Sequence, residues 1–594
     1  MNSTRERPTG ALALVVSGVL GFAFGVAFRN WQDAVETAQV VAGLVHYPAD
    51  SPFFIYHVKL WTVLHQIGAV LLRLGLGEIT ISTLLSGLIG QLSFQALAMT
   101  TFAISRRTWL SIGIPFLVLI SGIYDLGVIY PVMLIGTPFT YGAIGLSGIV
   151  LIVALLGSGW WRTGAFLLAL MPAVHPSLGF WLTVIVALCV VIDWNGTGPL
   201  RAAWRWYGAG ALVTALSLGV QLLMMPALPS IAPADAQRFL AQWVAFWDEH
   251  RRPVDLSANG VKMNVFVMIV ALVFLWRWRA DLPVAARLLL QAAAVAGGLG
   301  LVVAWASHQP PGRLPMWFLI AMPARVLNFD VFLAVPLLAG LLGRFERVPL
   351  AAWLLLILSV VLVGTRRSVA WEFIGQPKGS GWNALDMVAA IAIGSLLVGW
   401  LQARRRESAA STAGEVGEAR GGMIRLARWL TAVVLVIAAA GEAVEARRYS
   451  RSEPAAIFRD RTNDRVYGML SISHGLVATG GDLHLIQLRT RRPVLIDGGG
   501  LDGLPYALEA SALSARILRD VYGIDYFNPP PDARQGGRIP NQSARAAWEM
   551  FTLQKWRTVR ATYGVTEVVV PGDWNLDLPE IASGSNVRLY AIPE

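Results

Sequence analysis

The sequence has few charged residues for its length, and this scarcity decides its class. Charged side chains make up 14% of the 594 residues, whereas hydrophobic ones make up 55%. Soluble globular proteins carry about a quarter charged residues, so a soluble enzyme of this length is excluded. A disordered chain is also excluded, because 23 Trp and 23 Phe accompany long Leu, Val and Ala runs. The composition therefore indicates a polytopic membrane protein.

Cysteine and the common catalytic signatures are also scarce. The single cysteine, Cys189, lies inside an apolar run, which excludes a disulfide framework and a cysteine-based metal site. The chain has no HExxH, no Walker pattern and no Ser/His/Asp triad spacing. The glycine-rich turn DGGG at 497–500 gives only weak support to nucleotide binding. These patterns predict no cofactor, and they leave open whether the protein binds a divalent metal.

The formal net charge of +11 has an explanation that needs no nucleic acid. Lys and Arg collect at the cytoplasmic ends of membrane helices. If the apolar runs alternate in direction, the Arg clusters share one side of the membrane, and no nucleic-acid partner is expected. These clusters are Arg106 and Arg107, Arg162, Arg201 and Arg205, Arg277 and Arg279, Arg344 and Arg347, and 404–406.

The apolar runs predict about thirteen membrane spans, with the N-terminus in the cytoplasm. Residues 58–75 carry Lys59, His65 and Arg73 on an otherwise apolar pattern, which favours a helix in the membrane interface over a span. The expected spans are 11–28, 79–102, 109–124, 138–157, 164–174, 179–193, 207–225, 263–276, 286–306, 323–342, 349–364, 385–401 and 427–441.

The expected fold is mainly α, a transmembrane helical bundle followed by a polar α/β domain. Short strands are predicted in GLVATGG, LHLIQL, RPVLID, EVVVP and VRLYAI, with helices over 507–522 and 543–563. The predicted parts are a bundle over 1–401 with long outer loops at 29–78 and 226–262, a cytoplasmic linker at 402–425, a last membrane helix at 426–444 and a periplasmic domain at 445–594.

The first outer loop supplies candidate catalytic acids. Asp33 and Glu36 are three residues apart, so a helix starting there places both on one face. A carboxylate at the membrane surface is suited to act as general base toward an acceptor group. Asp33 is the first candidate, and Glu36, Asp50 and Asp125 are possible supporting acids. The structural alternative is an acid that stabilises a helix dipole.

Basic residues of the outer loops are candidates for binding a phosphate or another part of a substrate. The segment FWDEHRRPVDL places an Arg pair beside aromatic residues, and Arg grips phosphate through bidentate hydrogen bonds. The alternatives are a solvated loop with internal ion pairs, or an Arg that snorkels at a span end. The candidates are His57, Lys59, His175, His250, Arg251, Arg252, Arg313 and Arg325.

The layout resembles the GT-C class of membrane glycosyltransferases. Asp33 precedes AQVVAGLVHYP in the first loop, and the tail contains RTRRPVLID and WRTVRATYGVTEVVVP. The resemblance implies a polyprenyl-phosphate-linked sugar as donor, a glycan or lipid as acceptor, and Asp33 as base. It also implies an inner (cytoplasmic) membrane of bacterial type, with membrane lipids as partners. The WWD signature of oligosaccharyltransferases is absent, so protein N-glycosylation is not expected.

Three other functions stay open at this stage. A polymerase or ligase of surface polysaccharide also combines many spans with outer Arg and His residues. A transporter usually has paired repeats and ionisable residues at mid-membrane, and neither stands out in the sequence. A non-catalytic membrane assembly protein fits if the first-loop acids prove dispensable.

Overall fold

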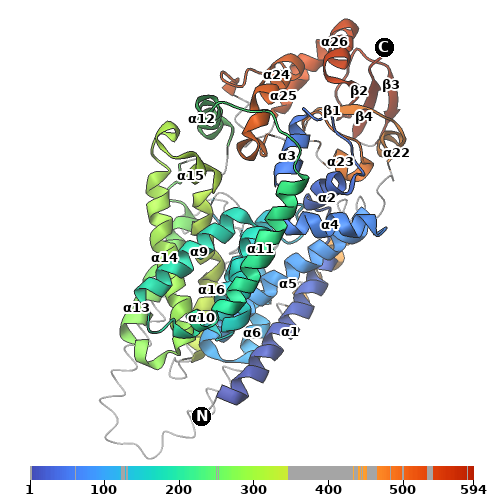
Figure 1. Cartoon of the computed structure of the whole chain (residues 1–594). Helices are drawn as coiled ribbons and strands as arrows, with labels where there is room; N and C mark the ends of the chain where they lie inside the picture. The colour runs from blue at the N-terminus through green and yellow to red at the C-terminus, as the bar shows by residue number, and fades with distance from the viewer. Residues whose placement is uncertain are drawn as a thin grey trace, which may run out of the picture.

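A computed structural model gives the chain a mainly helical bundle with a small mixed β-sheet near its C-terminus (Figure 1). Both parts of the expected fold are present at this level. The structure describes residues 3–60, 62–121, 127–128, 132–248, 251, 253–344, 433, 436, 439–441, 443–444, 446–450, 464–481, 483, 485–497, 501–531, 539–584 and 586–594.

Seven of the described helices are long and apolar enough to cross a membrane. Helices suit this environment because they satisfy every backbone hydrogen-bonding group within one segment. The protein is therefore a multi-pass membrane protein. The seven segments are Pro8–Ala27 in α1 (Ser3–Ala27), α5 (Glu78–Ser105), α7 (Thr140–Gly157), α11 (Trp204–Met224), α13 (Asn259–Arg277), α14 (Val284–Ala306) and Pro323–Arg344, which ends in α16 (Leu327–Arg344).

Fewer long spans are described than the thirteen expected. Three expected spans fall on shorter apolar helices, α6 (Thr108–Ser121), α8 (Trp161–Val174) and α9 (Pro176–Ile192). The expected spans at 349–364, 385–401 and 427–441, and the linker at 402–425, lie wholly or mostly outside the described residues.

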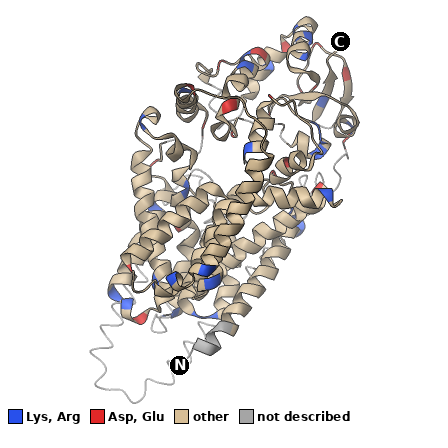
Figure 2. Ribbon diagram, viewed as in Figure 1, with Lys and Arg blue, Asp and Glu red and all other residues tan. Residues whose placement is uncertain are grey.

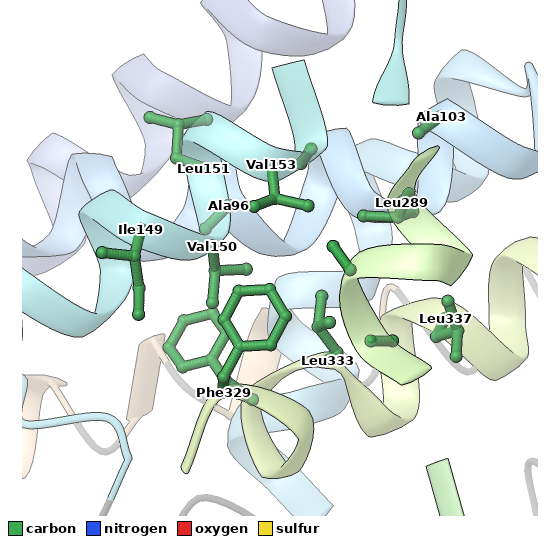
Figure 3. Close-up of a cluster of buried hydrophobic side chains, with 14 of the residues drawn as sticks. Ala96, Ala103, Ile149, Val150, Leu151, Val153, Leu289, Phe329, Leu333 and Leu337 are labelled. Atoms are coloured by element: carbon green, nitrogen blue, oxygen red, sulfur yellow. The ribbon is translucent and has the colours of Figure 1, made fainter. Parts of the chain in front are cut away.

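The bundle core lies where α5, α7, α14 and α16 meet. Figure 3 shows Phe329, Leu333 and Leu337 of α16 among small and β-branched side chains of α5 and α7, including Ala96 and Val150. These side chains are fully or almost fully buried. Close packing of this kind holds membrane helices together, because lipid supplies no hydrophobic driving force between them.

Lys and Arg residues gather at the bundle end opposite the sheet (Figure 2). There Arg107 Nε donates to the Gly343 carbonyl oxygen at 2.7 Å, and Arg106 donates to that of Ser158 at 3.1 Å. Arg344 donates in the same way to Asp281. These three Arg residues therefore lie at a common end of the bundle, as expected from spans that alternate in direction.

The first loop forms three helices at the other end of the bundle, α2 (Ala34–Ala42), α3 (Pro52–Leu60) and α4 (Val63–Arg73). The predicted interfacial helix at 58–75 is therefore two helices. Thr62 caps α4, because its backbone N–H donates to His65 Nδ1 at 2.7 Å. In Figure 1, α4 lies across the end of α5 and beside α2.

The segment after α11 also lies at this end. It includes α12 (Pro233–Gln242) and a π-helical turn at Trp243–Trp247. The Trp247 ring stacks on Tyr526 of the tail with centroids 5.7 Å apart, so this loop packs with the C-terminal domain. The remaining short elements are α10 (Gly198–Ala202), 3-10 turns at Arg279–Asp281, Pro311–Arg313 and Pro323–Val326, and α15 (Met316–Ile320).

The C-terminal sheet has four strands in the order β1-β2-β4-β3. The strands β1 and β2 are parallel, and β4 pairs antiparallel with both β2 and β3. The elements are α22 (Arg465–Ile472), β1 (Leu476–Thr479), α23 (Ile486–Thr490), 3-10 turns at Leu504–Tyr506 and Leu508–Ala510, α24 (Ser511–Tyr522), α25 (Asn541–Glu549), α26 (Leu553–Tyr563), β2 (Val565–Pro571), β3 (Glu580–Ser583) and β4 (Val587–Ala591).

Three sequence predictions for this domain need correction. The segment LHLIQL is not a strand, because its second half begins the helix α23, whose residues are buried against α2. RPVLID makes only an isolated bridge from Val494 to Val477. The helix expected over 543–563 is two helices, separated by residues 550–552, and the Thr552 side chain caps α26.

Candidate functional site

Asp33 lies directly before α2, at the bundle end that carries the sheet. Its Oδ1 accepts a hydrogen bond from the Thr140 backbone N–H at 3.0 Å, at the N-terminus of α7. Its own N–H donates to the Pro138 carbonyl oxygen at 3.0 Å. An acid at a helix N-terminus is favourable, so the first loop is anchored to α7. The same contacts fix the carboxylate at the start of a membrane span.

Glu36 is one helical turn further along α2 and is electrostatically coupled to Asp33. Burial raises the pKa of Glu36 well above its ordinary value, and the charges of Asp497 and Asp33 raise it further. A hydrogen bond with the Leu488 backbone lowers it only in part. We call Asp33, Glu36 and Asp497 the acidic site. It joins the first loop to the C-terminal domain.

A glycine in the DGGGLDG segment lets the tail approach the first loop closely. A Cβ atom added at Gly503 would collide with the ring of Tyr56 on α3. Burial raises the pKa of Tyr56 beyond its ordinary value, and the charges of Asp33, Tyr506 and Asp502 contribute. Tyr56 therefore lies between the acidic site and the residues that follow Asp497.

Polar contacts hold the tail against the first loop on the other side of the acidic site. Tyr47 donates a hydrogen bond to Gln487 Oε1 at 2.5 Å, and Gln487 Nε2 donates to the Glu36 carbonyl oxygen at 2.9 Å. Lys59 of α3 pairs with Glu509, with its Nζ 2.5 Å from Oε1. Lys59 was predicted to bind substrate, and in this structure its ammonium group is engaged by Glu509.

His57, another predicted substrate residue, is buried beside the acidic site rather than exposed in it. Its Nδ1 lies 2.7 Å from Thr37 Oγ1, and its ring packs against Tyr47 and Phe53. Burial lowers the pKa of His57 to about 3. The neutral imidazole supports the packing of α3 on α2 and carries no positive charge for a phosphate at neutral pH.

Arg251 is buried together with Asp248. Its Nη1 donates to Asp248 Oδ2 at 2.6 Å, and its Nε donates to the Leu319 carbonyl oxygen at 2.6 Å. Burial alone would lower the pKa of Arg251, but the charges of Asp248, Tyr506 and Asp502 outweigh burial and raise it. The guanidinium lies 5.4 Å from the centre of the Tyr506 ring. Tyr506 thus connects Arg251 with Tyr56 and the acidic site.

A cavity of about 370 Å³ opens beside Arg251. Its wall is mostly apolar and comes from the end of α14, the Pro-rich loop after it and the segment after α12. Arg251 Nη2 is buried and has no hydrogen-bond partner among the described residues. A buried cationic donor beside an apolar cavity is suited to an amphiphile with an anionic head group.

His175 and Arg325 were predicted separately, and the structure brings them together. Arg325 Nη1 lies 3.0 Å from His175 Nε2, and His175 caps α9. Arg325 follows Pro323 and Ala324, which line the cavity. By contrast, Asp50 and Arg313 are exposed in separate turns, and neither forms an ion pair among the described residues.

Three predicted site residues, Asp125, His250 and Arg252, lie outside the described residues. Within the described part of the chain, no three His, Cys, Asp or Glu side chains are placed so that they could hold a metal ion. The arrangement that is present consists of carboxyl groups, phenols and one buried guanidinium.

Sequence reasoning missed the tail's contribution, namely Asp497, Asp502 and Tyr506. The available signal was the composition of DGGGLDG, in which two acids and four glycines follow a predicted strand. It also missed Tyr56, because nothing local distinguishes that tyrosine from a packing residue.

The comparisons with known proteins leave the family open. No protein-family model matches this sequence, and no curated protein sequence matches it at a significant level.

Proposed function

We propose that this protein is a membrane glycosyltransferase that uses a polyprenyl-phosphate-linked sugar. It acts at the outer face of a cytoplasmic membrane, on a glycan or lipid acceptor. The observation that carries the proposal is a continuous row of residues at one end of a membrane bundle. This row runs from the acidic site through Tyr56 and Tyr506 to Arg251, which borders an apolar cavity. The GT-C-like layout of the sequence supports the same function.

Each part of the row has a role in this reaction. The cavity takes the start of the polyprenyl chain. The Arg251 Nη2, which has no partner among the described residues, donates to the phosphate of the donor. The acceptor hydroxyl oxygen attacks the anomeric carbon, the bond from that carbon to the phosphate oxygen breaks, and polyprenyl phosphate leaves. Asp33 takes the hydroxyl proton as general base, while Arg251 stabilises the leaving phosphate.

The other carboxyl groups suit acceptor binding. Glu36, with its raised pKa, is a hydrogen-bond donor when protonated, whereas a carboxyl group such as that of Asp502 only accepts when it is ionised. Sugar hydroxyls need both kinds of partner. Because Asp497 and Asp502 belong to the tail and Asp33 to the first loop, the C-terminal domain completes the site.

The test is transfer of radiolabelled sugar from a polyprenyl-phosphate donor in membranes that contain the protein. Asp33→Asn keeps an oxygen that can accept from the Thr140 N–H, so the anchor to α7 is retained and only the base is lost. We expect transfer to fall by roughly 10²- to 10⁴-fold. The control is Asp50→Asn, which removes an exposed carboxylate of the same loop. Wild-type transfer by Asp33→Asn would exclude Asp33 as the base, and no transfer by the wild type would contradict the proposal.

A further inference from the structure

A second ionisable site lies inside the bundle, away from the acidic site. Asp330 is in the first turn of α16 and within the apolar segment Pro323–Arg344. Its side chain is fully buried, and neither carboxyl oxygen has a hydrogen-bond partner among the described residues. Ionisable residues within membrane spans are costly and usually mark ion or proton sites.

A second polar group approaches the same place from α13. Asn264 is fully buried, its Nδ2 donates to the Gly297 carbonyl oxygen of α14 at 3.2 Å, and its Oδ1 has no partner among the described residues. A Cβ atom added at Gly297 would lie 3.0 Å from Asp330 Oδ2. Both side chains therefore border Gly297, where α13, α14 and α16 pack together.

The three residues lie at a similar depth in the bundle. Each is five to nine residues inside the end of its apolar segment that faces the first loop. At about 1.5 Å per residue this is roughly 8 to 14 Å. The site is thus inside the apolar layer and below the cavity beside Arg251.

Ionisable groups near this site belong to the ends of the surrounding elements. On α13 and α14 they are Lys262, Arg277 and Arg287, and the turn before α16 carries Arg325. The other elements packed against α16 contribute Glu78 of α5 and Tyr141 of α7, and α16 itself ends at Arg344. No described ion pair links any of them to Asp330.

Three buried oxygen atoms, two of Asp330 and one of Asn264, thus accept no hydrogen bond from any described residue. They lie inside the apolar layer of the bundle. An uncompensated carboxylate there would cost far more than the bundle can offset. One positive charge bound at the carboxyl group removes this cost. Oxygen atoms alone are the ligands that hard cations prefer.

We propose that Asp330 and Asn264 bind a single monovalent cation, a proton or Na⁺, between α13, α14 and α16. This site is independent of the proposed glycosyl transfer, since none of its residues belongs to the acidic site or lines the cavity. Occupancy removes a bare charge from the junction of three spans and so stabilises their packing.

The experiment follows thermal unfolding of the full-length protein in nanodiscs by its Trp fluorescence. Wild type, Asp330→Asn and the control Asp255→Asn, which changes an exposed loop carboxylate, are compared from pH 5 to 9 in NaCl and in choline chloride of equal ionic strength. If a proton is bound, the wild-type unfolding equilibrium shifts toward the unfolded state by up to tenfold per pH unit as pH rises. Asp330→Asn lacks that component, and Asp255→Asn keeps it.

Bound Na⁺ gives a different result. Na⁺ then raises the wild-type midpoint above that in choline at high pH, and Asp330→Asn shows no such difference.

Infrared spectra supply a second measurement, since a bound proton gives a carboxylic acid C=O band that Asp330→Asn lacks. If Asp330→Asn does not fold, Asn264→Leu replaces it and should weaken the same response. Equal responses of wild type and variant to both pH and Na⁺, with no difference in the infrared band, would overturn the proposal.

Discussion

At the residue scale, the environment of Glu36 makes protein stability depend on pH. The ordinary Glu pKa is 4.5, and burial beside Asp497 and Asp33 raises the folded-state pKa well above it. The folded state then holds this proton more tightly than the unfolded chain does. Stability contributed by the bound proton is therefore present at pH below 4.5 and is lost as pH rises toward the folded pKa.

Glu36→Gln should consequently raise the thermal midpoint at neutral pH, because Gln remains uncharged. Between the ordinary pKa and the folded-state pKa of Glu36, the free energy of unfolding of the wild type should fall by up to about 1.4 kcal/mol per pH unit. The variant should lack this decrease. The measurement is thermal unfolding between pH 4 and 9, with Asp50→Asn as an exposed control that should follow the wild type. The interpretation fails if wild type and Glu36→Gln lose stability in parallel.

At the element scale, the site depends on how α23 packs against α2. Gln487 makes two short contacts across this junction, to Tyr47 and to the Glu36 backbone. Gln39 of α2 donates to the Leu488 carbonyl oxygen at 3.0 Å. Because Asp497 follows α23 by only a few residues, these hydrogen bonds position the tail's carboxylate beside the first loop.

Gln487→Leu should therefore lower both stability and sugar transfer. The change removes the acceptor of the Tyr47 O–H and a donor to the Glu36 carbonyl oxygen, at a cost of about 1 to 3 kcal/mol. Thermal unfolding and the transfer assay measure the two effects. The control is Gln554→Ala on the exposed face of α26, which should alter neither. Wild-type transfer by Gln487→Leu would show that α23 does not position the site.

At the scale of the whole molecule, the two bundle ends differ in charge and in what they carry. One end has the Arg residues that join α5, α7 and α16. The other has the first loop and the C-terminal sheet (Figures 1 and 2). The cavity beside Arg251 lies at this end too. The positive-inside rule then predicts that the Arg end faces the cytoplasm.

This orientation can be tested by cysteine labelling, since the only native cysteine, Cys189, is buried. In a Cys189→Ala background, Asp50→Cys marks the end with the sheet and Arg205→Cys marks the other. A membrane-impermeant maleimide should label Asp50→Cys in intact cells and Arg205→Cys only after permeabilisation. The reverse pattern would invert the proposed topology and move the acidic site to the cytoplasm.

Much of the architecture could be predicted from local patterns. The hydrophobic runs located the long helices, since a membrane span needs only a sufficient length of apolar side chains. Three of the five expected strands, β1, β2 and β4, were also found from alternation and turn residues. The helix α23 was missed, because its apolar residues fit a short strand equally well and only burial against α2 decides between them.

The candidate site was less predictable from sequence. Asp33 and Glu36 were recognised from their spacing, because residues three apart share one helix face. The electrostatic effect of Asp497 on Glu36 could not be inferred, since more than 400 residues separate the two in the sequence. The same is true of the ion pair between Lys59 and Glu509. It is also true of Asp330, which lacks a hydrogen-bond partner among the described residues because of the way three helices pack.

The sequence by itself determined that this is a membrane protein, where many of its spans lie and which end of the bundle is basic. Hydrophobicity and charge act on each segment separately, so those properties can be predicted without knowledge of the fold. Only the tertiary structure decided that the tail's carboxylates join the first loop, that Arg251 borders a cavity, and that Asp330 lies unpaired among the described residues. Those features depend on which distant segments pack together, because burial and electrostatic coupling act only over short distances in space.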